Sequence, residues 1–166
     1  MPRNVYVDET AILIGNVEIH DGVSIWPYAV LRGDQNGRIV VGENSNIQDH
    51  VVLHTAEEHP TIIGKDCTIG HGAVVNGAVV GDRCIIGMNS SILDGAVVGD
   101  DCIIGANAVI TANMIVPSRS VVVGVPGRII RSDDRNNRER ALQSSLAYQR
   151  LRDEHLSGAY TRRKAP

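Results

Sequence analysis

The side chains of this chain best suited to bind a metal ion or to carry a proton are its six histidines. They are His20, His50, His54, His59, His71 and His155. His54 directly follows Leu53, Asn76 directly follows Val75, and the two polar positions are 22 residues apart. Whether these side chains can meet depends on the elements that carry them.

Aliphatic residues recur every six positions along most of the chain. The unbroken part of this series is Val80, Ile86, Ile92, Val98, Ile104, Ile110, Val116 and Val122. Its earlier members are Leu13, Ile19, Ile25, Leu31, Val41, Ile47, Leu53, Ile63, Ile69 and Val75. A period of six fits neither an α-helix nor a simple alternating strand. It predicts an all-β fold, a left-handed parallel β-helix in which each hexapeptide forms one side of a triangular coil.

Four residues after each aliphatic residue, a second inward position takes a smaller side chain, as at Ala29 and Ala73. A narrow core needs one bulky and one small residue on each side of the triangle. The three cysteines, Cys67, Cys84 and Cys102, fall at this small position. We therefore expect them to be buried free thiols that serve packing.

The period converts sequence distance into spatial position. One coil takes about eighteen residues, and the series is interrupted between Thr55 and Ile62, as it is between Arg32 and Ile39. The spacing therefore predicts that His54 and Asn76 point outward on the same side, one coil apart, at roughly 4.8 Å. His71 projects from a neighbouring part of the turn, so we expect it to meet His54 across a subunit contact.

Composition limits the partners. The chain of 166 residues predicts one domain, and its net charge of −3 gives no reason to expect binding to nucleic acid. It opens with MPRNVYVDE, which lacks the apolar region of a signal peptide, and no apolar run is long enough to span a bilayer. We therefore expect a cytoplasmic protein with no membrane partner.

The periodic region ends near VGVPGRIIR, and good helix formers follow it. The expected organisation is a β-helix domain over residues 1–130, a C-terminal α-helix over 131–158 packed along the coil, and a flexible tail over 159–166. Ser132 is the expected N-terminal cap of that helix. Leu142 and Leu146, with Tyr148 and Leu151, form an apolar stripe of roughly helical spacing.

Four stretches resemble the gamma class of carbonic anhydrases among the hexapeptide-repeat proteins. They are SIWPYAVLRGD (24–34), NIQDHVVLHT (46–55), TIGHGAVVNGAVVGD (68–82) and VVVGVPGRIIR (121–131). This resemblance implies a homotrimer with a zinc ion at each subunit interface and a small-molecule substrate such as carbon dioxide. Iron and cobalt are the alternative metals.

The resemblance also implies a ligand set. His54 matches a ligand from one subunit, His71 matches the ligand donated by the neighbouring subunit, and Asn76 stands where the family has its third histidine. A neutral amide is a weaker zinc donor than imidazole. The chain therefore resembles a divergent member, with Asn76 a weak ligand or none and zinc bound at low occupancy or absent.

Further polar residues match the family pattern around this site. Arg32 and Asp34 resemble its interfacial ion pair, which we expect to fix the trimer. Gln48 and Asp49 resemble the polar pair near the metal-bound water.

The loop after His54 adds candidates whose roles the sequence leaves open. Glu57 and Glu58 are candidates for a proton relay, with two solvated loop charges as the alternative. His50 or His59 could replace the missing ligand, but an exposed strand residue and a loop residue are the favoured interpretations.

These residues support several hypotheses about function. The first is a carbonic-anhydrase-like lyase with an altered metal site. The alternatives are a metal-free enzyme or thioesterase that uses the same cleft, and a non-catalytic trimeric scaffold. An acyltransferase ranks last, because such relatives lack the RGD, NIQD and LHT motifs.

Overall fold

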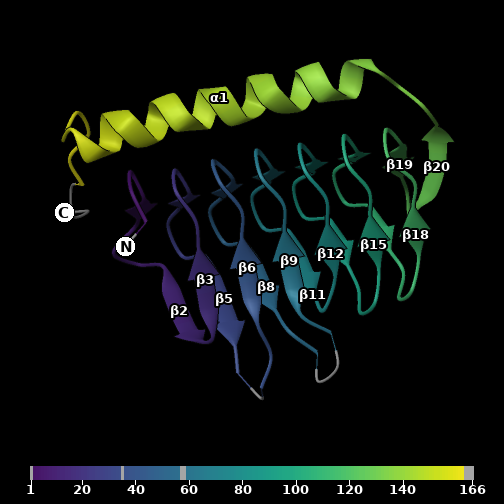
Figure 1. Ribbon diagram of the computed structural model, residues 1–166, viewed down its shortest axis with the longest axis horizontal. Coiled ribbons are helices and arrows are strands. Elements are labelled where there is room, and N and C mark those ends of the chain that lie inside the picture. Colours follow the sequence, from purple (N-terminus) through teal and green to yellow (C-terminus); the bar gives the residue numbers. More distant parts are fainter. Residues whose placement is uncertain (1, 35, 57–58, 163–166) are drawn as a thin grey trace.

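The computed structural model describes residues 2–34, 36–56 and 59–162. The chain forms a left-handed parallel β-helix, and one long helix, α1 (Asn136–Leu156), lies along one side of it (Figure 1). The predicted fold class is confirmed. Glu57 and Glu58, the candidate proton relay, lie outside the described residues.

Each face of the triangular coil is one sheet, here called sheets A, B and C. Sheet A contains β1 (Tyr6–Val7), β4 (Ser24–Ile25), β7 (Asn46–Ile47), β10 (Thr68–Ile69), β13 (Ile85–Ile86), β16 (Ile103–Ile104), β19 (Val121–Val123) and β20 (Arg128–Arg131). Sheet B contains β2 (Ile12–Gly15), β5 (Val30–Gly33), β8 (Val52–His54), β11 (Val74–Asn76), β14 (Ser91–Ile92) and β17 (Val109–Ile110). Sheet C contains β3 (Val17–Ile19), β6 (Ile39–Val41), β9 (Thr61–Ile63), β12 (Val79–Val80), β15 (Val97–Val98) and β18 (Ile115–Val116). Neighbouring strands are parallel except β19 and β20.

The six-residue series supplies the core of the coil. Ile25, Leu53 and Ile104, for example, are fully buried. Leu13 keeps the period but is 39% exposed, because its strand β2 lies at the open edge of sheet B and no coil covers it. The three cysteines are buried and free, as expected.

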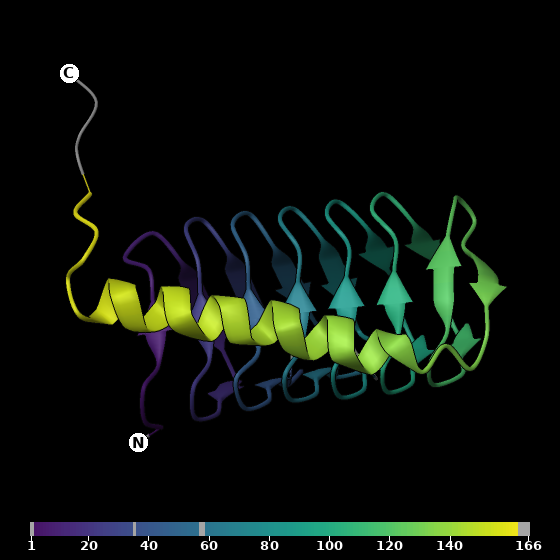
Figure 2. The ribbon, with the colours of Figure 1, turned by 90° about the horizontal axis from the view of Figure 1, so that it is seen from above.

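Helix α1 covers sheet A, as the view from above shows (Figure 2). The expected apolar stripe is only partly buried, since Leu142, Tyr148 and Leu151 are half-buried and Leu146 is exposed. The buried helix residues are Asn137, Ala141, Ser145 and Arg152, while Leu146 is 52% exposed. The reason is that part of the covered sheet face is polar, so small and hydrogen-bonding side chains fit against it better than leucines.

The helix is attached to the coil by hydrogen bonds. Ser144 Oγ lies 2.9 Å from Thr68 Oγ1, and the guanidinium of Arg152 donates to the carbonyl of Gly22 at 2.6 Å. The expected cap, Ser132, precedes the helix; instead Asp134 accepts a hydrogen bond from the N–H of Asn136. Among the described residues, no helix is long and apolar enough to cross a membrane.

Candidate functional site

Three polar residues form one row across sheet B. Arg32 on β5 is the register partner of His54 on β8, and His54 is the register partner of Asn76 on β11. Each follows a buried aliphatic residue of the core series, so its side chain points outward. The predicted stacking of His54 and Asn76, one coil apart, is thus present in the structure.

The hydrogen bonds of His54 define which ring nitrogen carries the proton. Nδ1 lies 2.8 Å from the backbone carbonyl of Arg32, which can only accept, so Nδ1–H is the donor. Nε2 lies 3.0 Å from the Arg32 guanidinium, which can only donate, so Nε2 is the acceptor. The lone pair that a metal ion would need is therefore on Nε2, the outer nitrogen of the ring.

Arg32 also binds Asp34 within the same chain. Its guanidinium donates to Asp34 Oδ2 at 2.6 Å, and this hydrogen bond lowers the pKa of the Asp34 carboxyl. The second oxygen, Oδ1, is buried and has no hydrogen-bond partner among the described residues. Arg32 therefore links a carboxylate to the imidazole of His54.

Asn76 has a partner on the next coil. Its Nδ2 donates to Oδ1 of Asp94, which lies 18 residues further along the chain. Sequence reasoning missed Asp94, although the coil length of about eighteen residues could have found it above Asn76. A carboxylate can only accept, so the amide group presents its NH₂ to Asp94.

A second cluster lies at the corner between sheets A and B, around His71. Its Nδ1 is 2.9 Å from Oδ2 of Asp49, and its Nε2 is 3.4 Å from the hydroxyl of Tyr148 on helix α1. Burial raises the pKa of Tyr148, and the charge of Asp49 raises it further. Tyr148 therefore keeps its proton and can donate to Nε2, through a long and weak hydrogen bond. Sequence reasoning gave Tyr148 only a packing role.

Gln48 supports the corner around His71 from within the chain. Its side chain is 4% exposed, its Nε2 donates to Asn46 at 3.0 Å, and its Oε1 accepts the backbone N–H of His71 at 3.2 Å. Both ends of the amide are thus engaged inside the chain. Gln48 holds the backbone of His71 in place.

The two clusters lie at different places on the triangle, His54 near the B–C corner and His71 at the A–B corner. No group of three His, Cys, Asp or Glu side chains that could hold a metal ion occurs in the described part of one chain. The donor chemistry nevertheless fits a divalent cation, because both histidines direct Nδ1 to a protein oxygen and keep Nε2 as the outer atom. A complete site would need a second copy of the chain.

The two remaining candidate ligands are separated by the fold. His50 occupies a left-handed position (φ +59°) at the A–B corner, and its ring stacks on Tyr28 with centroids 5.2 Å apart. His59 lies at the B–C corner, where a Cβ added to Gly95 would come within 3.4 Å of its Nε2. His59 therefore shares the corner of Asp94, whereas His50 does not.

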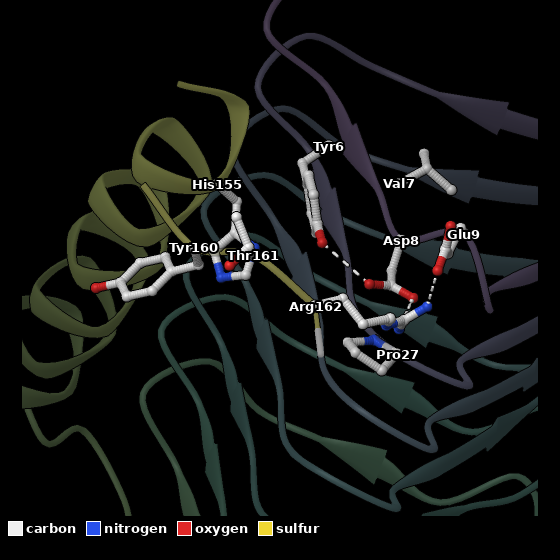
Figure 3. Close-up of a pocket in the computed structure, with 9 residues that line it drawn as sticks. All are labelled: Tyr6, Val7, Asp8, Glu9, Pro27, His155, Tyr160, Thr161 and Arg162. Atoms are coloured by element: carbon white, nitrogen blue, oxygen red, sulfur yellow. Dashed lines mark hydrogen bonds and ion pairs between the residues drawn. The ribbon is translucent and has the colours of Figure 1, made fainter. Parts of the chain in front are cut away.

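A pocket of about 450 Å³ lies elsewhere, where the C-terminal segment meets the first coil (Figure 3). Arg162 pairs with Asp8 at 2.9 Å and also with Glu9. Tyr6 donates to Asp8 at 3.0 Å, and burial together with this hydrogen bond raises the pKa of Tyr6 to about 12. The polar groups that line this pocket pair with one another, which indicates that they anchor the C-terminal segment.

Comparisons with known proteins agree with this fold. A family model described as the GMPPB C-terminal domain matches residues 13–130. The chain is 46% identical over 149 residues to a protein of Methanocaldococcus jannaschii named "Probable carbonic anhydrase", covering 90% of this chain and 93% of that one. It is 39% identical to the mitochondrial gamma carbonic anhydrase 1 of Arabidopsis thaliana, covering 93% of this chain but only 58% of that protein. Among solved structures, a hexapeptide transferase family protein from Anaplasma phagocytophilum is 33% identical, with a TM-score of 0.76 and coverage of 90% of this chain and 91% of that one.

The coil and its outward polar rows define a hexapeptide-repeat protein with a left-handed β-helix. The chain belongs to the gamma carbonic anhydrase family, and its coil to the domain family that the matching model describes.

Proposed function

We propose that copies of this chain form a homotrimer that holds a divalent metal ion at each subunit interface. His54 of one copy and His71 of the neighbouring copy would be the two imidazole ligands, with Asn76 as a weak third donor. Zinc, iron or cobalt would fill the site, at low occupancy for zinc. The reaction would be the hydration of carbon dioxide or of another small carbonyl substrate.

The observation that carries this proposal is the shared tautomer geometry of the two histidines. The carbonyl of Arg32 holds Nδ1 of His54, and the carboxylate of Asp49 holds Nδ1 of His71. Ligating histidines in proteins use the same arrangement, because it fixes the ring and makes the other nitrogen a better donor. The two rings also remain accessible, with exposed side-chain fractions of 24% for His54 and 47% for His71.

The remaining residues have distinct tasks in this proposal. A bound metal ion would lower the pKa of a coordinated water molecule to about 7. Gln48 fixes the backbone of His71, and Asp49 fixes its ring. Arg32 would leave Nε2 of His54 and turn to the unpartnered Oδ1 of Asp34, which can accept a second hydrogen bond in a bidentate pair. The hydroxyl of Tyr148 would likewise release Nε2 of His71, with which it shares a long hydrogen bond.

Mixing two variants tests the shared site. His54→Ala and His71→Ala would each remove a ligand from every interface of a pure trimer. When the two are denatured, mixed in equal amounts and refolded, statistical assembly would restore both histidines at about a quarter of the interfaces. We expect metal content and carbon dioxide hydration to return together in the mixture. If the mixture stays as empty as its components while wild type binds metal, the ligands are not shared between copies.

One observation favours a second candidate, a metal-free cleft. In the single chain the guanidinium of Arg32 already occupies Nε2 of His54 at 3.0 Å. If that bond persists in the assembled protein, the cleft presents a cationic group and two histidines that can act as general bases. Metal analysis by mass spectrometry on protein purified without chelator or a histidine tag separates the two candidates. Stoichiometric iron or cobalt, or zinc at lower occupancy, supports the first, and hydrolysis of thioesters by metal-free protein supports the second.

A further inference from the structure

Asp94 is a charged side chain hydrogen-bonded to Asn76, the residue at which this chain departs from the family's ligand pattern. Asp94 Oδ1 accepts a hydrogen bond from Asn76 Nδ2 across one coil, and both side chains are partly buried. The other end of the Asn76 amide, Oδ1, accepts no hydrogen bond within the part of the chain that the structure describes.

This contact decides which way the amide of Asn76 is turned. An amide can present either its oxygen or its NH₂ to a neighbour, and the two orientations have similar shapes. The Asp94 carboxylate has no proton to donate, so only the NH₂ can face it. The amide oxygen is then the atom left for a ligand beside His54, its register partner.

We propose that Asp94 positions Asn76 as an oxygen donor and thereby sets the metal preference of the site. This inference rests on the function proposed above. The two imidazoles and the amide oxygen of Asn76 form a mixed nitrogen and oxygen donor set, and the Asp94 carboxylate is hydrogen-bonded to the same amide. Such a set suits harder ions such as Mn²⁺ and Fe²⁺ better than three imidazoles would, and the negative charge of Asp94 favours any cation there.

The first test uses the metal-free protein. The side-chain NH₂ of Asn76 should give distinct amide signals in an ¹⁵N-resolved NMR spectrum, protected from exchange with water by the Asp94 carboxylate. In Asp94→Ala these signals should move and exchange faster. In Asp100→Asn, which changes a carboxylate at a different corner of the coil, they should stay as in wild type. Unchanged Asn76 signals in Asp94→Ala would overturn the proposal.

The second test measures binding of Mn²⁺ and Zn²⁺ to the assembled protein by calorimetry. Removing a residue that orients a ligand usually weakens metal binding about 10–100-fold. We expect Asp94→Ala to weaken Mn²⁺ binding by that factor and Zn²⁺ binding by less. Asp94→Glu, which keeps the acceptor, should recover part of the loss. Asp100→Asn should leave both dissociation constants unchanged.

The outcomes separate this inference from the proposed function. If wild type binds metal, His54→Ala abolishes binding and Asp94→Ala binds both ions as wild type does, only the role of Asp94 is wrong. If wild type binds neither of these ions, nor Fe²⁺ or Co²⁺, the proposed metal site fails, and the inference fails with it.

Discussion

His54 and Asn76 are register partners on β8 and β11, so their side chains project from sheet B side by side, at matching positions on neighbouring strands. The parallel pairing of these strands imposes this relationship, whatever the chemistry of the two residues. In the proposed metal site, position 76 would therefore stand beside the His54 ligand, and its amide would affect how well the site holds a metal ion.

Replacing that amide with imidazole should restore a three-histidine donor set. We expect Asn76→His to tighten zinc binding by at least about tenfold, or ~1.4 kcal/mol, and to raise carbon dioxide hydration with it. Asp94 could accept the N–H of the new ring, which would orient it further. Zinc titration with a competing chelator and a stopped-flow hydration assay would measure both effects. Metal content that stays at background in this variant would show that the inferred ligand geometry is wrong.

The Arg32 side chain should be important for assembly. We expect Arg32→Ala to weaken the proposed trimer, because it removes the partner of Asp34 and leaves that carboxylate without compensation at the interface. Sedimentation at micromolar concentration would show the dissociation. Arg38→Ala is the matched control, because Arg38 forms a similar 2.6 Å pair with Glu18 on an exposed surface, where such pairs contribute about 0–1 kcal/mol. A trimer equally stable in both variants would remove the interface role of Arg32.

Tyr6 should make the protein sensitive to alkaline pH. Its pKa is raised from 10 to about 12 by burial and by the hydrogen bond to Asp8, so folding favours the protonated phenol. The stability that this adds is fully present below pH 10 and is lost as the pH rises toward 12. We expect Tyr6→Phe to flatten the fall of the thermal unfolding midpoint over this range. The same change at exposed Tyr28 should leave the fall as in wild type.

Arg152 should stabilise the attachment of helix α1 to the first coil. Arg152 is 6% exposed, and its guanidinium donates to the carbonyl of Gly22, 130 residues away in sequence. Arg152→Met should lower the free energy of unfolding by about 2–3 kcal/mol, because the buried carbonyl loses a charged donor. Urea unfolding would measure this. Arg150→Met, on the exposed side of the helix, should change the free energy by less than about 0.5 kcal/mol.

The coil could be predicted from sequence because its period is carried by single residues at fixed intervals. The series through Ile86 and Ile104 gave the core directly, and the same counting placed His54 beside Asn76. The helix surface could not be predicted in this way. Which side of a helix is buried depends on the surface it meets. Sheet A presents polar groups such as Thr68, and Ser144 of the helix forms a hydrogen bond with it.

The polar contacts of the site were predicted less completely than the core. Family resemblance singled out Arg32 and Asp34 as a pair, but the bond from Arg32 to Nε2 of His54 depends on side-chain conformation, which the period does not determine. Tyr148 reaches His71 from 77 residues further along the chain, and only the docking of helix α1 brings it there. Asp94 was within reach of the same counting that found Asn76.

The coil keeps its register on both sides of the interruption that follows His54. Ala56 and His59 pair across its base, and the buried hydroxyl of Thr61 accepts the N–H of Gly77 at 2.9 Å and donates to the carbonyl of His54. β8 and β9 on either side keep their strand partners. The segment at this corner could therefore be replaced without changing the pairing of the neighbouring strands. Segments of other lengths and chemistry could be grafted between Ala56 and His59, so this corner could change under selection or by design while the row from Arg32 to Asn76 stays fixed.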